Sequence, residues 1–161
     1  PITFPVEEGQ LPLTYNHHPT GRGNDYYDLS GEPLYPFGFG LSYTTFEISD
    51  LQLNKTTYSE NDTIVAKVTV KNTGSKAGSE VVQLYVKDLL ASVSRPVIEL
   101  KGFQKVYLKP VESKQILITV PAKELKFLDE KMNWIVEKGT YRILVGNSSK
   151  NLPLKQNIEV K

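Results

Sequence analysis

From residue 47 onward, apolar and polar side chains alternate along the chain. Alternation with a period of two is the pattern of a β-strand that buries one face. In IVAKVTV (64–70), Lys67 and Thr69 fall on the face opposite the apolar side chains. Four segments predict such half-buried strands, and their apolar sets are Ile64, Ala66, Val68 and Val70; Val82, Leu84 and Val86; Ile116, Ile118 and Val120; Tyr141, Ile143 and Val145.

The same part of the chain has no long helical pattern, and the residues after Pro121 could form one helical turn at most. KNTGSKAG (71–78) supplies turn chemistry, and further strand candidates are residues 46–53, 99–108, 134–137 and 156–160. Short alternating strands separated by turns predict an antiparallel β-sandwich of two sheets. Trp134 is expected as a core ring of this sandwich, with a ligand-binding ring as the alternative.

The first 46 residues lack this alternation and are rich in rings, with nine of the sixteen aromatic residues of the chain. Proline has no backbone N–H, so a hydrogen-bonded ladder would be interrupted at Pro12, Pro19, Pro33 and Pro36. An irregular arm of this kind cannot build its own core, and we expect it to lie against another surface. The predicted fold class is an all-β antiparallel sandwich with an irregular, aromatic-rich N-terminal arm.

Charge also changes near Phe46. Residues 1–46 hold one arginine, no lysine and five acids, whereas residues 47–161 hold eighteen basic and thirteen acidic residues. This shift places a boundary between two structural units near Phe46. The formal net charge of the whole chain is +1, which gives no field to steer nucleic acid or an anionic membrane, so neither is an expected partner. The absence of cysteine excludes disulfides and thiolate metal sites.

Rings in the arm have two interpretations. They could form a platform on which sugars stack, or they could fill an interface between domains. The interface is favoured because Gly38 and Gly40 suit close backbone packing better than the display of rings in water. The rings concerned are Tyr26, Tyr27, Tyr35, Phe37, Phe39 and Tyr43.

Polar candidates in the arm do not assemble into a catalytic or metal site. His17 and His18 are adjacent, so in an extended chain they point to opposite sides, and a hydrogen-bonded turn is favoured over a metal site. Glycoside chemistry needs two carboxylates held at a fixed separation. Asp25, Asp28 and Glu32 lie in a turn-rich segment with nothing to fix their separation, and we interpret them as surface acids. No catalytic, cofactor-binding or metal-binding residue is assigned.

Five segments carry a resemblance to a known family: LPLTYNHHPTGR (11–22), PLYPFGFGLSYTTF (33–46), VKNTGSKAGSEVVQLYVKD (70–88), SRPVIELKGFQKVYLKP (94–110) and GTYRILVG (139–146). In this order they resemble the C-terminal end of glycoside hydrolase family 3 enzymes, the β-glucosidases and β-xylosidases. The resemblance covers essentially the whole chain. Its most specific part is PFGFGLSYTTF followed by NTG and the phrase RPxxELKGF.

The resemblance implies that the chain has two parts. Family 3 enzymes have an N-terminal (β/α) barrel, a second α/β sandwich domain and often a C-terminal fibronectin type III-like domain. Residues 1–43 would then be the end of the α/β sandwich domain and an interdomain linker arm, and residues 44–161 the fibronectin type III-like (immunoglobulin-like) sandwich. The family's catalytic aspartate and its acid/base lie upstream, and neither motif occurs here. The chain alone is therefore expected to be inactive.

The resemblance also implies partners and a role. The parent enzyme, meaning the longer polypeptide of which this chain would be a segment, is expected to hydrolyse β-glucosides or β-xylosides with retention. The missing barrel and α/β sandwich domains are the expected partners, and the side chains expected to pack against them are Tyr35, Phe37, Phe39, Tyr43 and Phe46. Alternatives are a carbohydrate-binding or adhesion module, and a self-associating fragment whose dimer replaces the lost contacts. No cofactor is expected, and no compartment is assigned.

Overall fold

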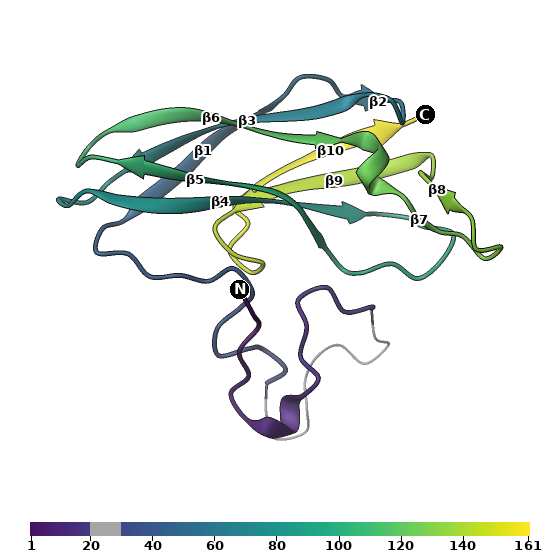
Figure 1. The fold of residues 1–161 in the computed structure, drawn as a ribbon, viewed down its shortest axis with the longest axis horizontal. Helices are drawn as coiled ribbons and strands as arrows, with labels where there is room; N and C mark the ends of the chain where they lie inside the picture. The colour runs from purple at the N-terminus through teal and green to yellow at the C-terminus, as the bar shows by residue number, and fades with distance from the viewer. Residues whose placement is uncertain (20–29) are drawn as a thin grey trace.

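The computed structural model describes residues 1–19 and 30–161 and consists of a sandwich of strands with an irregular arm below it (Figure 1). The described helical elements are two short 3-10 turns, η1 (Glu8–Gln10) in the arm and η2 (Ala122–Leu125) in the sandwich. The strands are β1 (Phe46–Leu53), β2 (Thr57–Tyr58), β3 (Thr63–Asn72), β4 (Gly78–Asp88), β5 (Glu99–Leu108), β6 (Ser113–Pro121), β7 (Phe127–Leu128), β8 (Trp134–Ile135), β9 (Gly139–Gly146) and β10 (Leu154–Val160).

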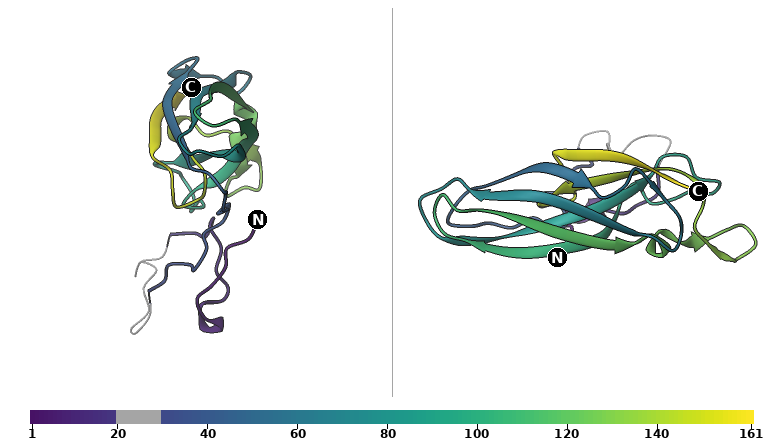
Figure 2. Two further views of the ribbon diagram at one scale, coloured as in Figure 1. Left: turned by 90° about the vertical axis from the view of Figure 1, so that its left-hand side faces the viewer. Right: turned by 90° about the horizontal axis from the view of Figure 1, so that it is seen from above.

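Two sheets form the sandwich. One has three strands in the order β1-β3-β6, and the other has five in the order β2-β10-β9-β4-β5. Neighbouring strands are antiparallel except for the short pairing of β2 with β10. Seen end-on, the sheets form two layers and the arm extends from one side of them (Figure 2). The predicted all-β sandwich is confirmed.

The core lies between the sheets and is filled by the side chains that the alternation predicted. All four apolar sets are buried, and Ile64, Val68 and Leu84 have no exposed surface. Full burial of one such side chain stabilises the fold by about 1.5–3 kcal/mol. The sandwich therefore has a complete core of its own.

Trp134 does not belong to this core, so the prediction of a core ring was wrong. It lies in the β7–β8 hairpin, which is separate from both main sheets, and its side chain is 64% exposed. The Nζ of Lys126 lies 5.4 Å from the centre of its ring. Phe127 of the same hairpin is buried instead, with the guanidinium of Arg95 4.1 Å from its ring centre. Alternation identified an extended segment here, but the two sheets do not reach this hairpin.

The arm covers part of the outer face of the five-stranded sheet. Gln83 and Tyr85 alternate with Val82, Leu84 and Val86 along β4, so they point away from the core. Both are nevertheless buried, at 4% and 0% exposure. Polar side chains on the outside of a sheet are buried in this way only when another segment covers them.

Among the described residues, no helix is long and apolar enough to span a membrane.

Candidate interdomain docking surface

Gln83 of β4 fastens the arm to the sandwich. Its Nε2 donates hydrogen bonds to the carbonyl oxygen of Gly38 at 3.0 Å and to that of Asn147 at 2.7 Å. Its Oε1 accepts a hydrogen bond from the Tyr85 hydroxyl at 2.6 Å. A buried carboxamide with both ends satisfied is fixed in place, because an unpaired buried polar group costs about 1–3 kcal/mol.

Gly38 suits this position for two reasons. Its φ of +81° lies in the left-handed region that favours glycine. A Cβ built on Gly38 would also overlap the carboxamide of Gln83. The close approach of the arm backbone to β4 therefore depends on glycine at this residue.

A cluster of three rings lies beside these hydrogen bonds of Gln83. Tyr15 stacks on Phe37 with ring centres 4.0 Å apart and meets Tyr85 edge-on at 5.9 Å. The backbone N–H of Ser149 donates to the carbonyl oxygen of Phe37 at 2.9 Å. Burial raises the pKa of the Tyr85 hydroxyl, so this group stays a neutral donor. Phe37 thus packs against the sandwich of its own chain.

The histidines hold a second contact between the arm and the sandwich. The backbone N–H of Val97 donates to the carbonyl oxygen of His17 at 2.9 Å. The His17 ring Nδ1 lies 2.9 Å from the carbonyl oxygen of Thr14, and the His18 ring Nδ1 lies 2.9 Å from the hydroxyl of Ser94. The two rings therefore have separate partners, one within the arm and one in the segment 89–98 between β4 and β5.

Arg95 organises the segment 89–98, and sequence reasoning missed this role. Its guanidinium pairs with Asp88 at 3.4 Å and with Glu99 at 3.0 Å, and only 10% of the Arg95 side chain is exposed. Burial raises the pKa of Asp88, although the charge of Arg95 opposes that effect. The sequence signal was a single arginine in the otherwise uncharged run ASVSRPVI (91–98), and Arg95 lies within a segment that carries the family resemblance.

The interior of the arm is held by a buried glutamine and not by an apolar core. Gln10 is 1% exposed, and its Oε1 accepts the backbone N–H groups of Val6 at 2.5 Å and Glu7 at 3.3 Å. Its Nε2 donates to the carbonyl oxygens of Ser30 at 2.9 Å and Glu32 at 3.2 Å. Through these four hydrogen bonds Gln10 joins residues 6–10 of the arm to residues 30–32.

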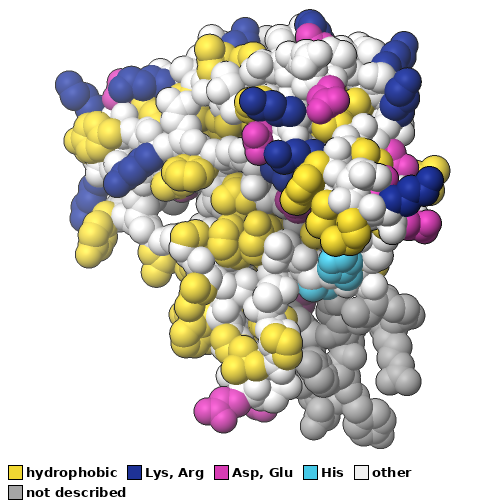
Figure 3. Space-filling model, turned by 45° about the vertical axis from the view of Figure 1, so that its right-hand side comes forward, with side chains coloured by type: hydrophobic (Ala, Val, Ile, Leu, Met, Phe, Trp, Pro, Cys, Tyr) yellow, Lys and Arg dark blue, Asp and Glu magenta, His cyan; other side chains and the backbone are white. Residues whose placement is uncertain are grey.

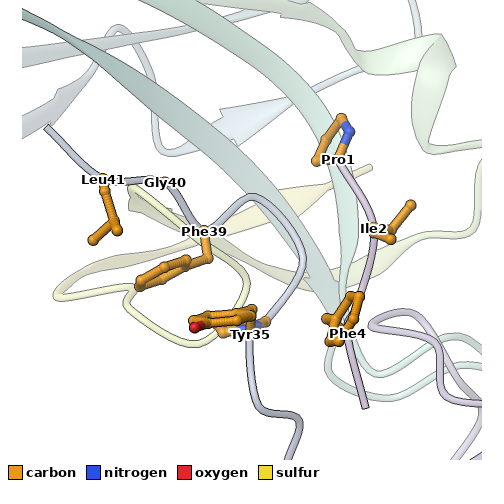
Figure 4. Close-up of a pocket in the computed structure, with 8 residues that line it drawn as sticks. Pro1, Ile2, Phe4, Tyr35, Phe39, Gly40 and Leu41 are labelled. Atoms are coloured by element: carbon orange, nitrogen blue, oxygen red, sulfur yellow. The ribbon is translucent and has the colours of Figure 1, made fainter.

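The outer side of the arm carries an open apolar groove of about 450 Å³ (Figure 4). Phe4 and Tyr35 form one wall through two backbone hydrogen bonds of 2.8 and 3.2 Å, and Tyr35 stacks on Phe39 with ring centres 5.1 Å apart. Among the described residues that line it, Tyr35 has the only ionisable side chain, so the groove suits an apolar surface better than a charged ligand. The lining residues are Pro1, Ile2, Phe4, Tyr35, Pro36, Phe39, Gly40 and Leu41.

The five side chains expected at an interface fall into two groups. Phe46 packs against the sandwich core, and Phe37 stacks on Tyr15. Tyr35, Phe39 and Tyr43 are exposed, at 46%, 44% and 91%. Sequence reasoning missed three further apolar side chains that are exposed beside them, Ile2 at 71%, Phe4 at 48% and Leu41 at 89%. Figure 3 shows apolar side chains gathered along the junction of the arm and the sandwich.

Among the candidate acids, Glu32 is described and does not line the groove. The acid Glu32 forms an exposed ion pair with Lys150 at 2.7 Å. Four other candidates from the sequence lie outside the described residues: Asp25, Tyr26, Tyr27 and Asp28.

Comparison with known proteins places this arrangement in a class. Residues 80–149 match the fibronectin type III-like domain. The whole chain is similar to a solved β-glucosidase involved in saponin metabolism from intestinal bacteria, with a TM-score of 0.94 and 38% identity over 99% of this chain and 22% of that one.

Two sequence relatives extend the comparison. The periplasmic β-glucosidase of Salmonella typhimurium is 42% identical over 92% of this chain and 21% of its own length. A β-xylosidase of Formosa agariphila is 45% identical over 96% of this chain and 22% of its own length. The chain thus spans about a fifth of the length of these relatives. It belongs to glycoside hydrolase family 3, as a segment that includes the family's fibronectin type III-like domain.

Proposed function

We propose that this chain is the non-catalytic C-terminal segment of a family 3 glycoside hydrolase. The parent enzyme hydrolyses β-glucosides or β-xylosides with retention of configuration, through a glycosyl–enzyme intermediate formed on its barrel domain. The segment docks on the catalytic domains and stabilises them. Residues 1–43 belong to the end of the α/β sandwich domain and the linker arm, and residues 44–161 form the docked module.

One observation carries the docking role: the arm is fastened to a self-sufficient sandwich on one side and leaves its rings exposed on the other. Gln83 and Tyr15 hold the arm against β4, while Leu41 and Tyr43 are about nine-tenths exposed. A contiguous apolar surface on a folded chain marks a protein interface or a ligand groove. The groove lining has no pair of carboxylates for glycoside chemistry, which favours the interface.

Hydrolysis of aryl β-glucoside and aryl β-xyloside tests the proposal. The assay compares the isolated chain, the full-length parent, and a parent truncated before Thr44. We expect turnover by the full parent, none by the isolated chain, and faster loss of activity on heating in the truncated parent. Turnover by the isolated chain, or unchanged heat resistance of the truncated parent, would contradict the proposal.

A carbohydrate-binding role is the second candidate, and the exposed Trp134 favours it. An exposed indole on a short hairpin offers a flat apolar face on which a sugar could stack. Trp134 is the only tryptophan, so tryptophan fluorescence, excited at a wavelength where the nine tyrosines do not absorb, reports on this ring alone. Titration with gluco- and xylo-oligosaccharides to millimolar concentration tests the idea. An unchanged emission spectrum would remove this candidate.

A further inference from the structure

The outer face of β5 carries two exposed rings on the same side of the sheet as the arm. Val106 and Leu108 of β5 are buried in the core, whereas Phe103 is 67% exposed and Tyr107 57% exposed. Phe103 is the cross-strand partner of Gln83 in β4. Directly paired residues point to the same face of a sheet. Since Gln83 binds the arm, Phe103 also faces the side on which the arm lies.

The segment 38–44 of the arm begins on this face at Gln83 and leaves it before Gly78, which faces the core because its cross-strand partner is the buried Leu108. At one end Gly38 is bound by Gln83, the partner of Phe103. At the other end Gly78 lies so close to the arm that a Cβ would be 2.8 Å from Thr44 Cγ2 and 3.0 Å from Ser42 Oγ. Gly78 begins β4 next to Ser79, whose cross-strand partner is Tyr107.

Two rows of exposed apolar side chains are therefore connected through Gln83, which binds Gly38 of the arm and pairs with Phe103 of β5. One row belongs to the arm and contains Phe39, Leu41 and Tyr43, which are 44%, 89% and 91% exposed. The other row belongs to the edge strand β5 and contains Phe103 and Tyr107. Lysines accompany both rows: Lys105 lies between the two rings of β5, and the Nζ of Lys76 is 5.9 Å from the Tyr43 ring centre.

We propose that the docking surface extends beyond the arm onto the outer face of β5, with Phe103 and Tyr107 as anchors. The occupant is the part of the parent polypeptide that precedes Pro1, and this inference rests on the proposed function. Pro1 itself lines the groove, so the preceding polypeptide enters on this face. The lysines define the chemistry of the occupant, which presents an apolar surface rimmed by acidic side chains.

The outer face of the three-stranded sheet supplies a matched control. Leu117 of β6 is 57% exposed, the same fraction as Tyr107, and its cross-strand partner is Lys67 of β3. It alternates with the buried Ile116 and Ile118, so it points away from the core on the opposite side of the sandwich. Leu117 is therefore as exposed as the proposed anchor Tyr107, but it lies outside the proposed docking surface.

The test measures Phe103→Ser, Tyr107→Ser and Leu117→Ser in the isolated chain and in the full-length parent. In the isolated chain all three are expected to leave the thermal unfolding midpoint nearly unchanged, because they alter exposed side chains. In the parent, Phe103→Ser and Tyr107→Ser are expected to shorten the half-life of activity at elevated temperature by about three- to tenfold. Leu117→Ser is expected to leave that half-life unchanged.

A double variant of the arm, Tyr35→Ser with Phe39→Ser, separates this inference from the proposed function. If it shortens the half-life of the parent while the β5 variants behave like Leu117→Ser, the extension onto β5 is wrong and the docking role stands. If neither the arm variant nor the β5 variants change the half-life of the parent, both proposals fail.

Sedimentation of the isolated chain completes the test. A dimer that Phe103→Ser dissociates, with no effect of that variant on the parent, makes a second copy the occupant and overturns the inference.

Discussion

The sandwich and the arm of this chain are held together by different interactions. In the sandwich the fully buried side chains are mostly apolar, such as Ile64, Leu84 and Ile143. Among the described residues of the arm the most buried side chain is Gln10, and the contacts with the sandwich include hydrogen bonds from Gln83 and the packing of rings around Tyr15. Apolar burial stabilises a unit without any partner, whereas hydrogen bonds that replace bonds to water contribute only about 0.5–1.5 kcal/mol each. The sandwich can therefore fold alone, while the arm gains most of its stability from what it contacts.

The largest expected effect is on the free energy of unfolding, and it distinguishes a leucine in the sandwich core from a leucine in the arm. Leu84 in the core has no exposed surface, and Leu41 in the arm is 89% exposed. We expect Leu84→Ala to lower the free energy of unfolding of the isolated chain by about 2–5 kcal/mol, because it leaves a cavity in a packed core. Leu41→Ala is expected to change it by less than about 0.5 kcal/mol. Urea unfolding measures both, and equal losses would contradict the division into two regions.

The next effect concerns the fastening of the arm. Gly38→Ala places a Cβ on the Gln83 carboxamide at a positive φ, which costs about 1–3 kcal/mol. We expect the arm to detach while the sandwich stays folded, so that limited proteolysis cleaves residues 1–40 faster and the unfolding midpoint changes little. Gly40→Ala is the matched control, since no atom lies within 4 Å of its added Cβ. Equal cleavage of the two variants would show that Gly38 is not a fastening residue.

A third prediction concerns the alkaline stability of the sandwich. Burial raises the pKa of Tyr141 to about 12, and its hydroxyl donates to the carbonyl oxygen of Glu137 at 2.9 Å. Burial also raises the pKa of Tyr58 and Tyr85 above 10.0, the ordinary value that applies in the unfolded chain. Above that pH the folded state binds more protons than the unfolded state, so stability falls as pH rises from about 10 toward 12.

Urea unfolding at several pH values from 8 to 12 checks this effect. The contribution of Tyr141 is fully present below about pH 10, and Tyr141→Phe is expected to flatten the alkaline part of the curve. Tyrosinate absorbance of the native protein should rise later than that of the urea-unfolded chain. A curve for Tyr141→Phe with the wild-type slope would contradict the assignment.

The smallest expected effect is at Trp134. Because its ring is 64% exposed, Trp134→Ala is expected to change the free energy of unfolding by less than about 0.5 kcal/mol. The emission maximum of the native protein should already lie near that of free tryptophan and shift little on unfolding. A blue-shifted native spectrum would indicate that Trp134 is buried in an apolar environment and would contradict its exposed position on the hairpin.

Sequence reasoning succeeded where one physical signal decided the structure. Alternation identified β3 and β6 with their buried faces, because a half-buried strand repeats every two residues. It misplaced Trp134, because alternation gives the face of a strand and not whether a core lies beneath it. It could not find Gln10 or Gln83, since a buried glutamine has no distinctive pattern along the chain and is defined by partners that are far away in sequence. The division of the interface rings into Phe37, packed inward, and Tyr35, exposed, likewise depends on where the arm crosses β4.

Hydrogen exchange of the isolated chain and of the full-length parent tests the contrast between the regions most directly. In the isolated chain, we expect amides of β3 and β4 to be strongly protected. The N–H groups of Phe4 and Tyr35, which donate to each other's carbonyl oxygens at 2.8 and 3.2 Å, are expected to exchange far faster. In the parent, protection of Phe4 and Tyr35 should rise toward that of the sandwich, while β3 and β4 change little. Equal protection of arm and sandwich in the isolated chain, or no gain in the parent, would contradict the docking of the arm on the catalytic domains.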